Sequence, residues 1–445
     1  GPRLATTSGA ASRSRRRVAG EQRLPQSLSL LLNHVQEQAL SSQSEKVTSR
    51  LIRLLHCLSP RITDGDTPTV LGIDLNVVRP LCAEGVPDEV PALRAALWKV
   101  VLGYLPADIF QWDGALAGAR AAHAGFVQEL LEQLAQSPGM GGEGSELVGA
   151  AAEEPLTPEA KEGSLPHILD QINKDVFRTR AELDFFARTL EGEDVAELEG
   201  RDLENVDVFH PRLHYDVLAR VLLLYARLNP GLHYVQGMNE LCAPLYFLFA
   251  QDPLNGDAAE ADTFFCFTLL MAGMRDAFQK TLDDSDDGLI GRVDQLNELL
   301  RHKDVQVWKH LEELHVRPVF YAVRWLTTML SQDLEMPETL RLWDSLLTDL
   351  AQPEPLLHYV CVAMVMFVRE ALLAGDFTDC LRLLQHYPPL PVEELLHSAA
   401  KLRAADLVPG GFSNLELAAV GLGQPLSAQR PVLGRWWLLR GRDRA

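Results

Sequence analysis

Arg178 and Gln236 stand out in this sequence as residues whose side chains and positions could do chemistry. Arg178 follows the apolar stripe of a predicted helix over 165–177 and lies three residues after Asp175. Gln236 precedes Gly237 in a short connection between two predicted helices, where its amide could point at a ligand. Each residue also has an ordinary interpretation. Arg178 could pair weakly with Asp175 on a helix surface, and Gln236 could be a satisfied loop amide.

The connection that holds Gln236 is suited to end one helix and begin another. Pro230 has no N–H group and Gly231 tolerates left-handed conformations, so the helix before them is expected to end there. Gly237 then permits a tight turn where the next helix begins. A glutamine beside a glycine at the mouth of a helix has little around it to obstruct its amide.

Several common site motifs are absent from the sequence. It contains no GxxxxGK[ST] phosphate loop, no GxSxG nucleophile turn, no HExxH zinc motif and no GxGxxG segment after a strand. A nucleotide on which this protein acts is therefore expected to be bound by another protein. His233 is interpreted as a loop histidine in preference to a catalytic one.

One acidic stretch, 283–288, has the beginning of a calcium loop. Acids occupy its first and fifth positions, serine its third and glycine its sixth, but position twelve is Asp294 where such loops use glutamate. No second loop accompanies it in the sequence. An acidic turn before the next helix is the preferred interpretation, and we expect no metal site.

Composition places the chain among soluble globular proteins. It has 445 residues, enough for two or three domains, with 47% hydrophobic and 23% charged residues. A net charge of −20 argues against nucleic acid as the main partner, because phosphate contacts need clustered Lys and Arg. Six dispersed cysteines without a CxxC pair indicate reduced, mostly buried thiols in a cytoplasmic protein. The longest apolar runs are too short for a transmembrane segment.

Helical periodicity dominates the sequence. Almost no stretch alternates with period two, and Leu and Ala outnumber β-branched residues, so the fold is predicted to be all-α. One or two short helices are expected within 26–59. The further predicted helices span 91–104, 112–136, 165–177, 214–228, 261–278, 289–301, 305–314, 318–331, 337–348, 353–374, 380–385 and 392–404.

Composition also divides the chain into segments. Residues 1–25 form a Ser- and Arg-rich basic tail, for which disorder is preferred over an organelle transit peptide. A short helical extension and linker follow over 26–70, and packing on the main domain is preferred over binding to a membrane surface. The main domain spans 71–403 with a flexible acidic insert over 137–165. A tail over 404–445, for which disorder is expected, ends in a basic-aromatic run that could instead dock elsewhere.

Four motifs in order along the chain resemble those of the TBC domain, the GTPase-activating domain that acts on Rab GTPases. They are Arg94-x-x-x-Trp98, Ile172-x-x-Asp175-x-x-Arg178, Tyr234-x-Gln236-Gly237-Met238 and Trp343-Asp344. Any one of these alone would be a weak signal, whereas their joint, ordered occurrence is strong. Within the family the chain looks most similar to the type called member thirteen. The resemblance covers about 71–403, apart from the acidic insert.

The resemblance implies an all-α fold of many packed helices in two subdomains, and an activity in which the partner carries the substrate. Arg178 would be an arginine finger that neutralises charge on the transferred phosphoryl group. Gln236 would be a glutamine finger that orients the attacking water. GTP and Mg²⁺ would belong to a Rab in its GTP-bound form, so no cofactor of this chain is expected. Because Rabs carry lipids, the protein would visit endomembranes transiently and so take part in vesicle trafficking.

The resemblance also assigns supporting residues. Asp175 would hold the loop that carries Arg178, called the arginine loop, or contact the GTPase. The loop that carries Gln236, called the glutamine loop, would be shaped by Tyr234, Gly237 and Asn239. Structural roles, bracing the first helix of the domain against the catalytic groove, are implied for Arg94 and Trp98.

The sequence departs from the family pattern in places, and two rival functions follow. Ala181 stands where the family often has proline, an aromatic element before the arginine motif is missing, and 190–207 is an unusual acidic stretch. One rival is a Rab-binding scaffold without catalysis, and the other is a helical adaptor with accidental matches. Retention of both Arg178 and Gln236 favours a catalytic activator.

Overall fold

The computed structural model describes residues 24–58, 72–137, 164–192, 205–278, 288–350 and 355–407. Within these ranges the regular elements are helices, and β structure is limited to two isolated bridges, Gly72–Asp108 and Thr189–Leu213. The prediction of an all-α fold is therefore confirmed. No helix in these ranges is both long and apolar enough to cross a bilayer.

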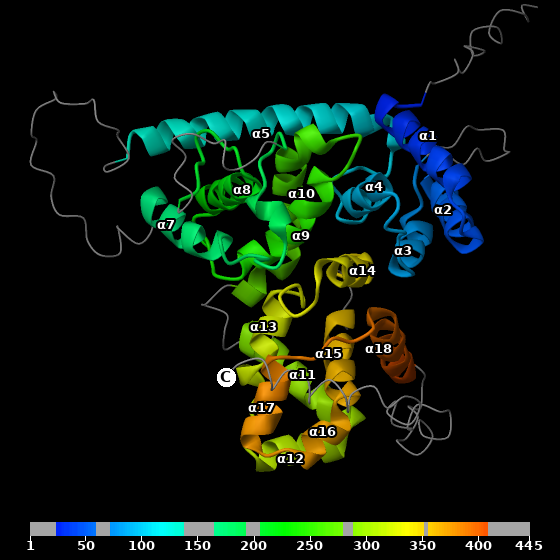
Figure 1. The fold of residues 1–445 in the computed structure, drawn as a ribbon, viewed down its shortest axis with the longest axis vertical. Helices are drawn as coiled ribbons and strands as arrows, with labels where there is room; N and C mark the ends of the chain where they lie inside the picture. Colours follow the sequence, from blue (N-terminus) through cyan, green and yellow to red (C-terminus); the bar gives the residue numbers. More distant parts are fainter. Residues whose placement is uncertain are drawn as a thin grey trace, which may run out of the picture.

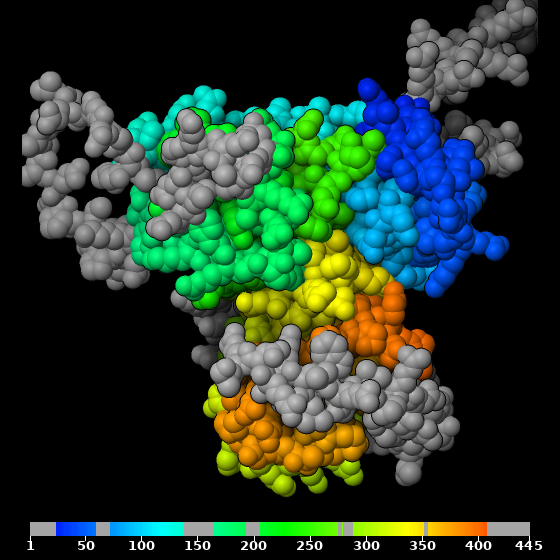
Figure 2. Space-filling view, in the orientation of Figure 1, coloured from blue at the N-terminus to red at the C-terminus, as the bar shows by residue number. Residues whose placement is uncertain are grey.

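The helices form two groups, one above the other in Figure 1, with one helix between them. The upper group contains α1 (Gln26–Ser41), α2 (Glu45–Leu58), α3 (Leu75–Ala83), α4 (Pro91–Val101), α5 (Trp112–Ala135), α7 (Leu165–Val176), α8 (His214–Leu228), α9 (Met238–Ala250) and α10 (Ala259–Phe278). The lower group contains α11 (Leu289–Lys303), α12 (Val305–Glu313), α13 (Ala322–Thr327), α15 (Leu356–Phe367), α16 (Arg369–Ala374), α17 (Phe377–Gln385) and α18 (Val392–Leu407). Helix α14 (Met336–Leu346) lies at the junction, between the green and orange surfaces of the space-filling view (Figure 2).

Short 3₁₀ turns, which the sequence analysis did not predict, connect several helices. They are η1 (Ile109–Gln111), η2 (Asp184–Ala187), η4 (Gly256–Ala258) and η6 (Pro318–Phe320). Helix α3, which contains Pro80, was also not predicted. Its start is stabilised by Asp74, whose side chain accepts a hydrogen bond from the Asn76 amide at 2.9 Å.

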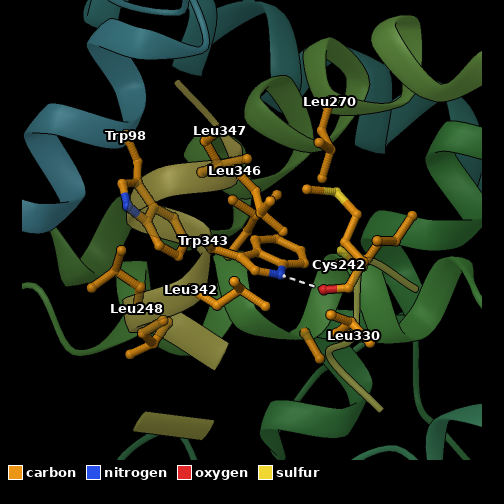
Figure 3. Close-up of a cluster of buried hydrophobic side chains, with 14 of the residues drawn as sticks. Trp98, Cys242, Leu248, Leu270, Leu330, Leu342, Trp343, Leu346 and Leu347 are labelled. Carbon is orange, nitrogen blue, oxygen red and sulfur yellow. Dashed lines mark hydrogen bonds between the residues drawn. The ribbon is translucent and has the colours of Figure 1, made fainter. Parts of the chain in front are cut away.

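The single helix predicted over 318–331 is wrong. The chain forms η6, then α13, and then a turn in which Met329 and Leu330 have φ values of 48° and 62°. Two apolar residues adopt this left-handed conformation because it buries both side chains and because the Trp343 indole donates to the Met329 carbonyl at 3.2 Å. Figure 3 shows that hydrogen bond in the buried cluster around Trp343.

The helix predicted over 353–374 is also divided. Helix α15 ends at Phe367 and α16 begins at Arg369, with Val368 between them in a non-helical conformation. Val368 is buried, so packing stabilises a break that no proline or glycine in the sequence marks. Residues 353 and 354 lie outside the described ranges.

Helix 214–228 was predicted correctly, and it ends directly before the Asn-Pro-Gly segment.

Helices α1 and α2 pack against α3, α4 and α5. The start of α1 is fixed by Asp113 of α5, which accepts hydrogen bonds from the amides of Gln26 and Ser27 at 2.7 and 3.0 Å. Arg50 of α2 donates to the carbonyl of Gly85 at 3.0 Å. Leu51, Leu54 and Leu58 of α2 are buried, which agrees with the preferred interpretation that this extension packs on the protein. Most of the predicted basic tail, acidic insert and C-terminal tail, and the acidic stretch 283–287, lie outside the described residues.

Asp344 of α14 is the centre of a buried polar cluster that joins α14 to α4 in the upper group. Its carboxylate, fully buried, accepts from Arg94 Nε at 3.1 Å, Trp98 Nε1 at 2.8 Å and the Val86 amide at 2.8 Å. The Trp98 ring lies 5.9 Å from the ring of Trp343, which belongs to α14 (Figure 3). Helix α4 is therefore bound to α14 by ionic, hydrogen-bonded and aromatic contacts at one place.

Replacing Asp344 with alanine is expected to destabilise the protein strongly. The change leaves the buried Arg94 guanidinium without its main counter-ion, which typically costs about 3–5 kcal/mol. Urea denaturation followed by circular dichroism measures the loss. The matched control is Asp170→Ala, because Asp170 pairs with Lys174 in an exposed i, i+4 contact that contributes little. Equal midpoints for the two variants would contradict a structural role for the Asp344 cluster.

Candidate functional site

The loop after α7 and the loop before α9 are joined by hydrogen bonds between side chains. Tyr234 extends from the second loop, and its hydroxyl lies 2.8 Å from Asp175 Oδ2 and 3.1 Å from Asn239 Oδ1, so the two acceptors share its single hydrogen. Burial, and next the charge of Asp175, raise the pKa of Tyr234. The hydroxyl therefore stays protonated and remains a donor at physiological pH.

Asn239 makes the second link between the same loops. Its Nδ2 donates to Thr179 Oγ1 at 2.9 Å, and its Oδ1 accepts from the Gly237 amide at 3.1 Å. The Thr179 hydroxyl in turn donates to the Asp175 carbonyl at 2.9 Å. Both Asn239 and Thr179 are buried. One amide side chain thus connects the residue after Arg178 to the residue after Gln236.

Gly237 supplies the backbone conformation that starts α9. Its φ of 101° is left-handed, and it is the residue that precedes the first turn of the helix. A Cβ at this position would meet only Thr328 Cγ2, at 3.9 Å, so the requirement for glycine is one of backbone conformation and not of space. This confirms the tight turn that the sequence predicts here.

Arg178 and Gln236 are both exposed, on the two loops that Asn239 and Tyr234 connect. Within the described ranges, neither side chain has a hydrogen bond or ion pair, and Asp175 bonds to Tyr234 instead of Arg178. The ordinary interpretations, a surface ion pair and a satisfied loop amide, are therefore wrong for this structure. The charged guanidinium of Arg178 and the neutral carboxamide of Gln236 are thus available to a partner. Tyr234 and Asn239, which join the two loops, make their hydrogen bonds within the protein.

Arg94 and Trp98 lie away from these loops, in the Asp344 cluster, where they brace α4 against α14. The structure thus separates the supporting residues into two sets: a set that connects the loops and a set within the core.

A surface hollow of about 340 Å³ between α11, α12 and η6 includes none of the loop residues. In the part of the chain that is described, no three His, Cys, Asp or Glu side chains gather as a metal site.

Three residues near the loops were missed by the sequence analysis: Thr179, Arg180 and Glu240. Thr179 follows Arg178 directly, and only its contact with Asn239 reveals its role. Arg180 and Glu240 read as surface charges in the sequence, yet each is only 5% exposed. No local pattern marks these two residues as buried, because both are covered by segments distant in the chain.

Asn239→Leu is expected to loosen both loops without emptying the space that the side chain fills. The variant loses the bonds to Thr179 and the Gly237 amide, for a cost of about 1–3 kcal/mol. Hydrogen exchange measured by mass spectrometry should become faster in peptides that contain Arg178 and Gln236. The matched control is Gln251→Ala, which removes an amide at the other end of α9 that bonds only to the Phe247 carbonyl. Unchanged exchange in both peptides would contradict the connection.

The amino-acid sequence and the fold both match known proteins. The family model for the Rab-GTPase-TBC domain matches residues 202–373, which include Gln236 and Trp343 but begin after Arg178. The chain is 36% identical to human TBC1 domain family member 13 over 74% of this chain and 94% of that protein. It is 29% identical to a TBC domain-containing protein of Schizosaccharomyces pombe, over 73% of this chain and 69% of that one.

A solved structure shares the fold. The Ypt/Rab-GAP domain of Gyp1p superposes with a TM-score of 0.59 and 20% identity, over 80% of this chain and 98% of that domain. The similarity in sequence to member 13 extends over nearly all of that protein. This chain therefore belongs to the Rab-GTPase-TBC domain family.

Proposed function

We propose that this protein stimulates GTP hydrolysis by a Rab-family GTPase and supplies Arg178 and Gln236 in trans. The observation that carries the proposal is the pair of exposed, unbonded side chains on two loops that Tyr234 and Asn239 connect. Membership of the TBC family supports the same activity. The chain itself has no phosphate-binding loop in its sequence, so the nucleotide belongs to the partner.

Arg178 acts on the charge that develops during phosphoryl transfer. The transition state carries negative charge on the transferred group and the leaving oxygen, and slow GTPases leave part of this charge without a partner. A guanidinium remains charged and donates two parallel hydrogen bonds to phosphate oxygens. Since the Arg178 side chain is exposed and makes no bond in the described structure, it can reach the partner without first breaking an internal contact.

Gln236 acts on the attacking water. Its carboxamide accepts a hydrogen bond from the water through Oε1 and donates one through Nε2 to a neighbouring acceptor. This bifunctional group orients the water in line with the scissile bond and takes the place of the GTPase's own glutamine. The left-handed Gly237 beside it fixes the direction in which the loop enters α9.

The connection between the loops makes the two groups act together. Positioning contributes to catalysis when the reacting groups are held near their working geometry before the reaction begins. Here Asp175, Thr179 and Asn239 hold the backbone on both sides, while the two end groups stay free. GTP and Mg²⁺ arrive with the Rab, and the protein is an activator of another enzyme that uses no cofactor of its own.

This activity would place the protein in vesicle trafficking. Rabs are anchored to membranes by lipids, so this activator would be recruited to endomembranes through its partner. A second candidate function is a Rab-binding scaffold without catalysis. A scaffold needs no free arginine and glutamine, so the exposure of both favours the activator.

Arg178→Ala and Gln236→Ala should each abolish most of the stimulation. Each change is expected to raise the barrier by about 2 kcal/mol or more, which is about a thirtyfold loss of rate. The measurement is single-turnover GTP hydrolysis by a panel of purified Rabs, with and without this protein. Binding of the Rab should change far less than the rate, because both groups act mainly in the transition state.

Matched controls remove the same side-chain types elsewhere. Arg382→Ala and Gln251→Ala take an exposed arginine from α17 and an exposed amide from the far end of α9. Both controls should stimulate as the unaltered protein does. Full stimulation by both finger variants would show that the two residues are assigned wrongly, and a panel in which no Rab responds would favour the scaffold.

A further inference from the structure

A second arginine and a glutamate follow the two exposed side chains closely in the chain, Arg180 on the loop after α7 and Glu240 in the first turn of α9. Arg180 comes two residues after Arg178, and Glu240 comes four residues after Gln236. Both are nearly fully buried. Buried charged groups are costly unless they are paired and fully hydrogen-bonded, so a role is expected for them.

Arg180 fastens the arginine loop to the segment that leads into α14. Its φ of 51° is left-handed, and its side chain is buried. Its Nη1 donates to the Leu334 carbonyl at 2.6 Å, and its Nη2 donates to Thr339 Oγ1 at 2.8 Å. Nη1 also lies 3.2 Å from Glu182, whose side chain is largely exposed. The Nε of Arg180 is buried and has no acceptor in the described structure.

Glu240 lies in the first turn of α9 with its carboxylate incompletely bonded. Its Oε1 accepts only a long hydrogen bond from Asn239 Nδ2, at 3.4 Å, and its buried Oε2 has no donor in the described structure. The charged groups that act on it electrostatically are Arg180, Glu182, Asp175 and Asp333. Burial raises the pKa of Glu240 to about 7, against the opposing effect of Arg180 and with a smaller contribution from the three carboxylates.

Arg180 and Glu240 are therefore complementary and not yet paired. One has an unused buried donor, the other an unused buried acceptor, and no ion pair within 4.0 Å joins them in the described residues. We propose that these two are positioning residues: ionised Glu240 attracts Arg180 and so holds the arginine loop against the glutamine loop, which sets Arg178 beside Gln236. This inference rests on the proposed function and deepens it.

The charge of Glu240 should then control the stimulation of the Rab. A neutral Glu240 no longer attracts Arg180, so stimulation should fall as pH falls through about 7. The stability of the folded protein should change in the opposite direction, and increase as pH falls. Because the pKa of Glu240 is raised in the folded protein, protonation of Glu240 stabilises the fold. This stabilisation is fully present below the ordinary glutamate pKa and is lost as pH rises through about 7.

Glu240→Gln tests the proposal with a side chain of nearly the same shape. Stimulation by the unaltered protein, at saturating concentration and relative to the intrinsic rate of the Rab, should rise about tenfold from pH 6 to pH 8. That is roughly the ratio of ionised fractions for a group with a pKa of about 7. The variant should show a flat profile at the lower level. Its melting temperature at pH 8 should be equal to or above that of the unaltered protein, whereas structural damage would lower it.

Two further variants complete the test. Arg180→Met should give the same flat profile although Glu240 still titrates, because the partner of its charge is gone. Glu298→Gln makes the same change at an exposed glutamate of α11 and should keep the original profile. A Glu240→Gln protein with the full tenfold pH dependence overturns the inference and leaves the proposed function standing. Absence of stimulation by the unaltered protein at pH 8 overturns the proposed function, and the inference with it.

Discussion

The hydrogen bonds of Tyr234 and Asn239 are the constraint on which the site depends. An exposed side chain on an isolated loop samples many positions, and ordering it during the reaction would cost free energy. Here the backbone beside Arg178 and the backbone beside Gln236 share one buried amide and one buried hydroxyl. The two end groups remain free for a partner because the residues that join the loops make their hydrogen bonds with one another.

This pair of loops is itself held by α14. Helix α14 carries Asp344, which binds Arg94 and Trp98 of α4, and Thr339, which accepts from Arg180. The same helix lies between the upper and lower groups of helices (Figure 1). Contacts in the core are thereby continuous with those behind the site. A change in the packing of α14 would shift the arginine loop, because the hydrogen bonds of Arg180 join the two.

Sequence analysis predicted the parts of the structure that local chemistry specifies. Asn-Pro-Gly ends α8 and Gly237 begins α9 because each residue type restricts the backbone in its own way. The break after α13 was not predictable, since Met329 and Leu330 become left-handed only when Trp343 and the core select that conformation. Arg180 and Glu240 were missed for a similar reason: a charged residue shows in the sequence, but its burial by distant segments does not. The roles proposed for Arg178 and Gln236 follow only from the combination of motifs.

The central claim is that a glutamine of this protein does in trans what a GTPase's own glutamine would otherwise do. The most direct test is single-turnover GTP hydrolysis by a responsive Rab in which the Rab's own catalytic glutamine has been replaced by alanine. The unaltered protein should still stimulate this Rab, whereas the Gln236→Ala variant should not. If the unaltered protein fails to stimulate the altered Rab while it still binds it, Gln236 does not orient the water and the claim is contradicted.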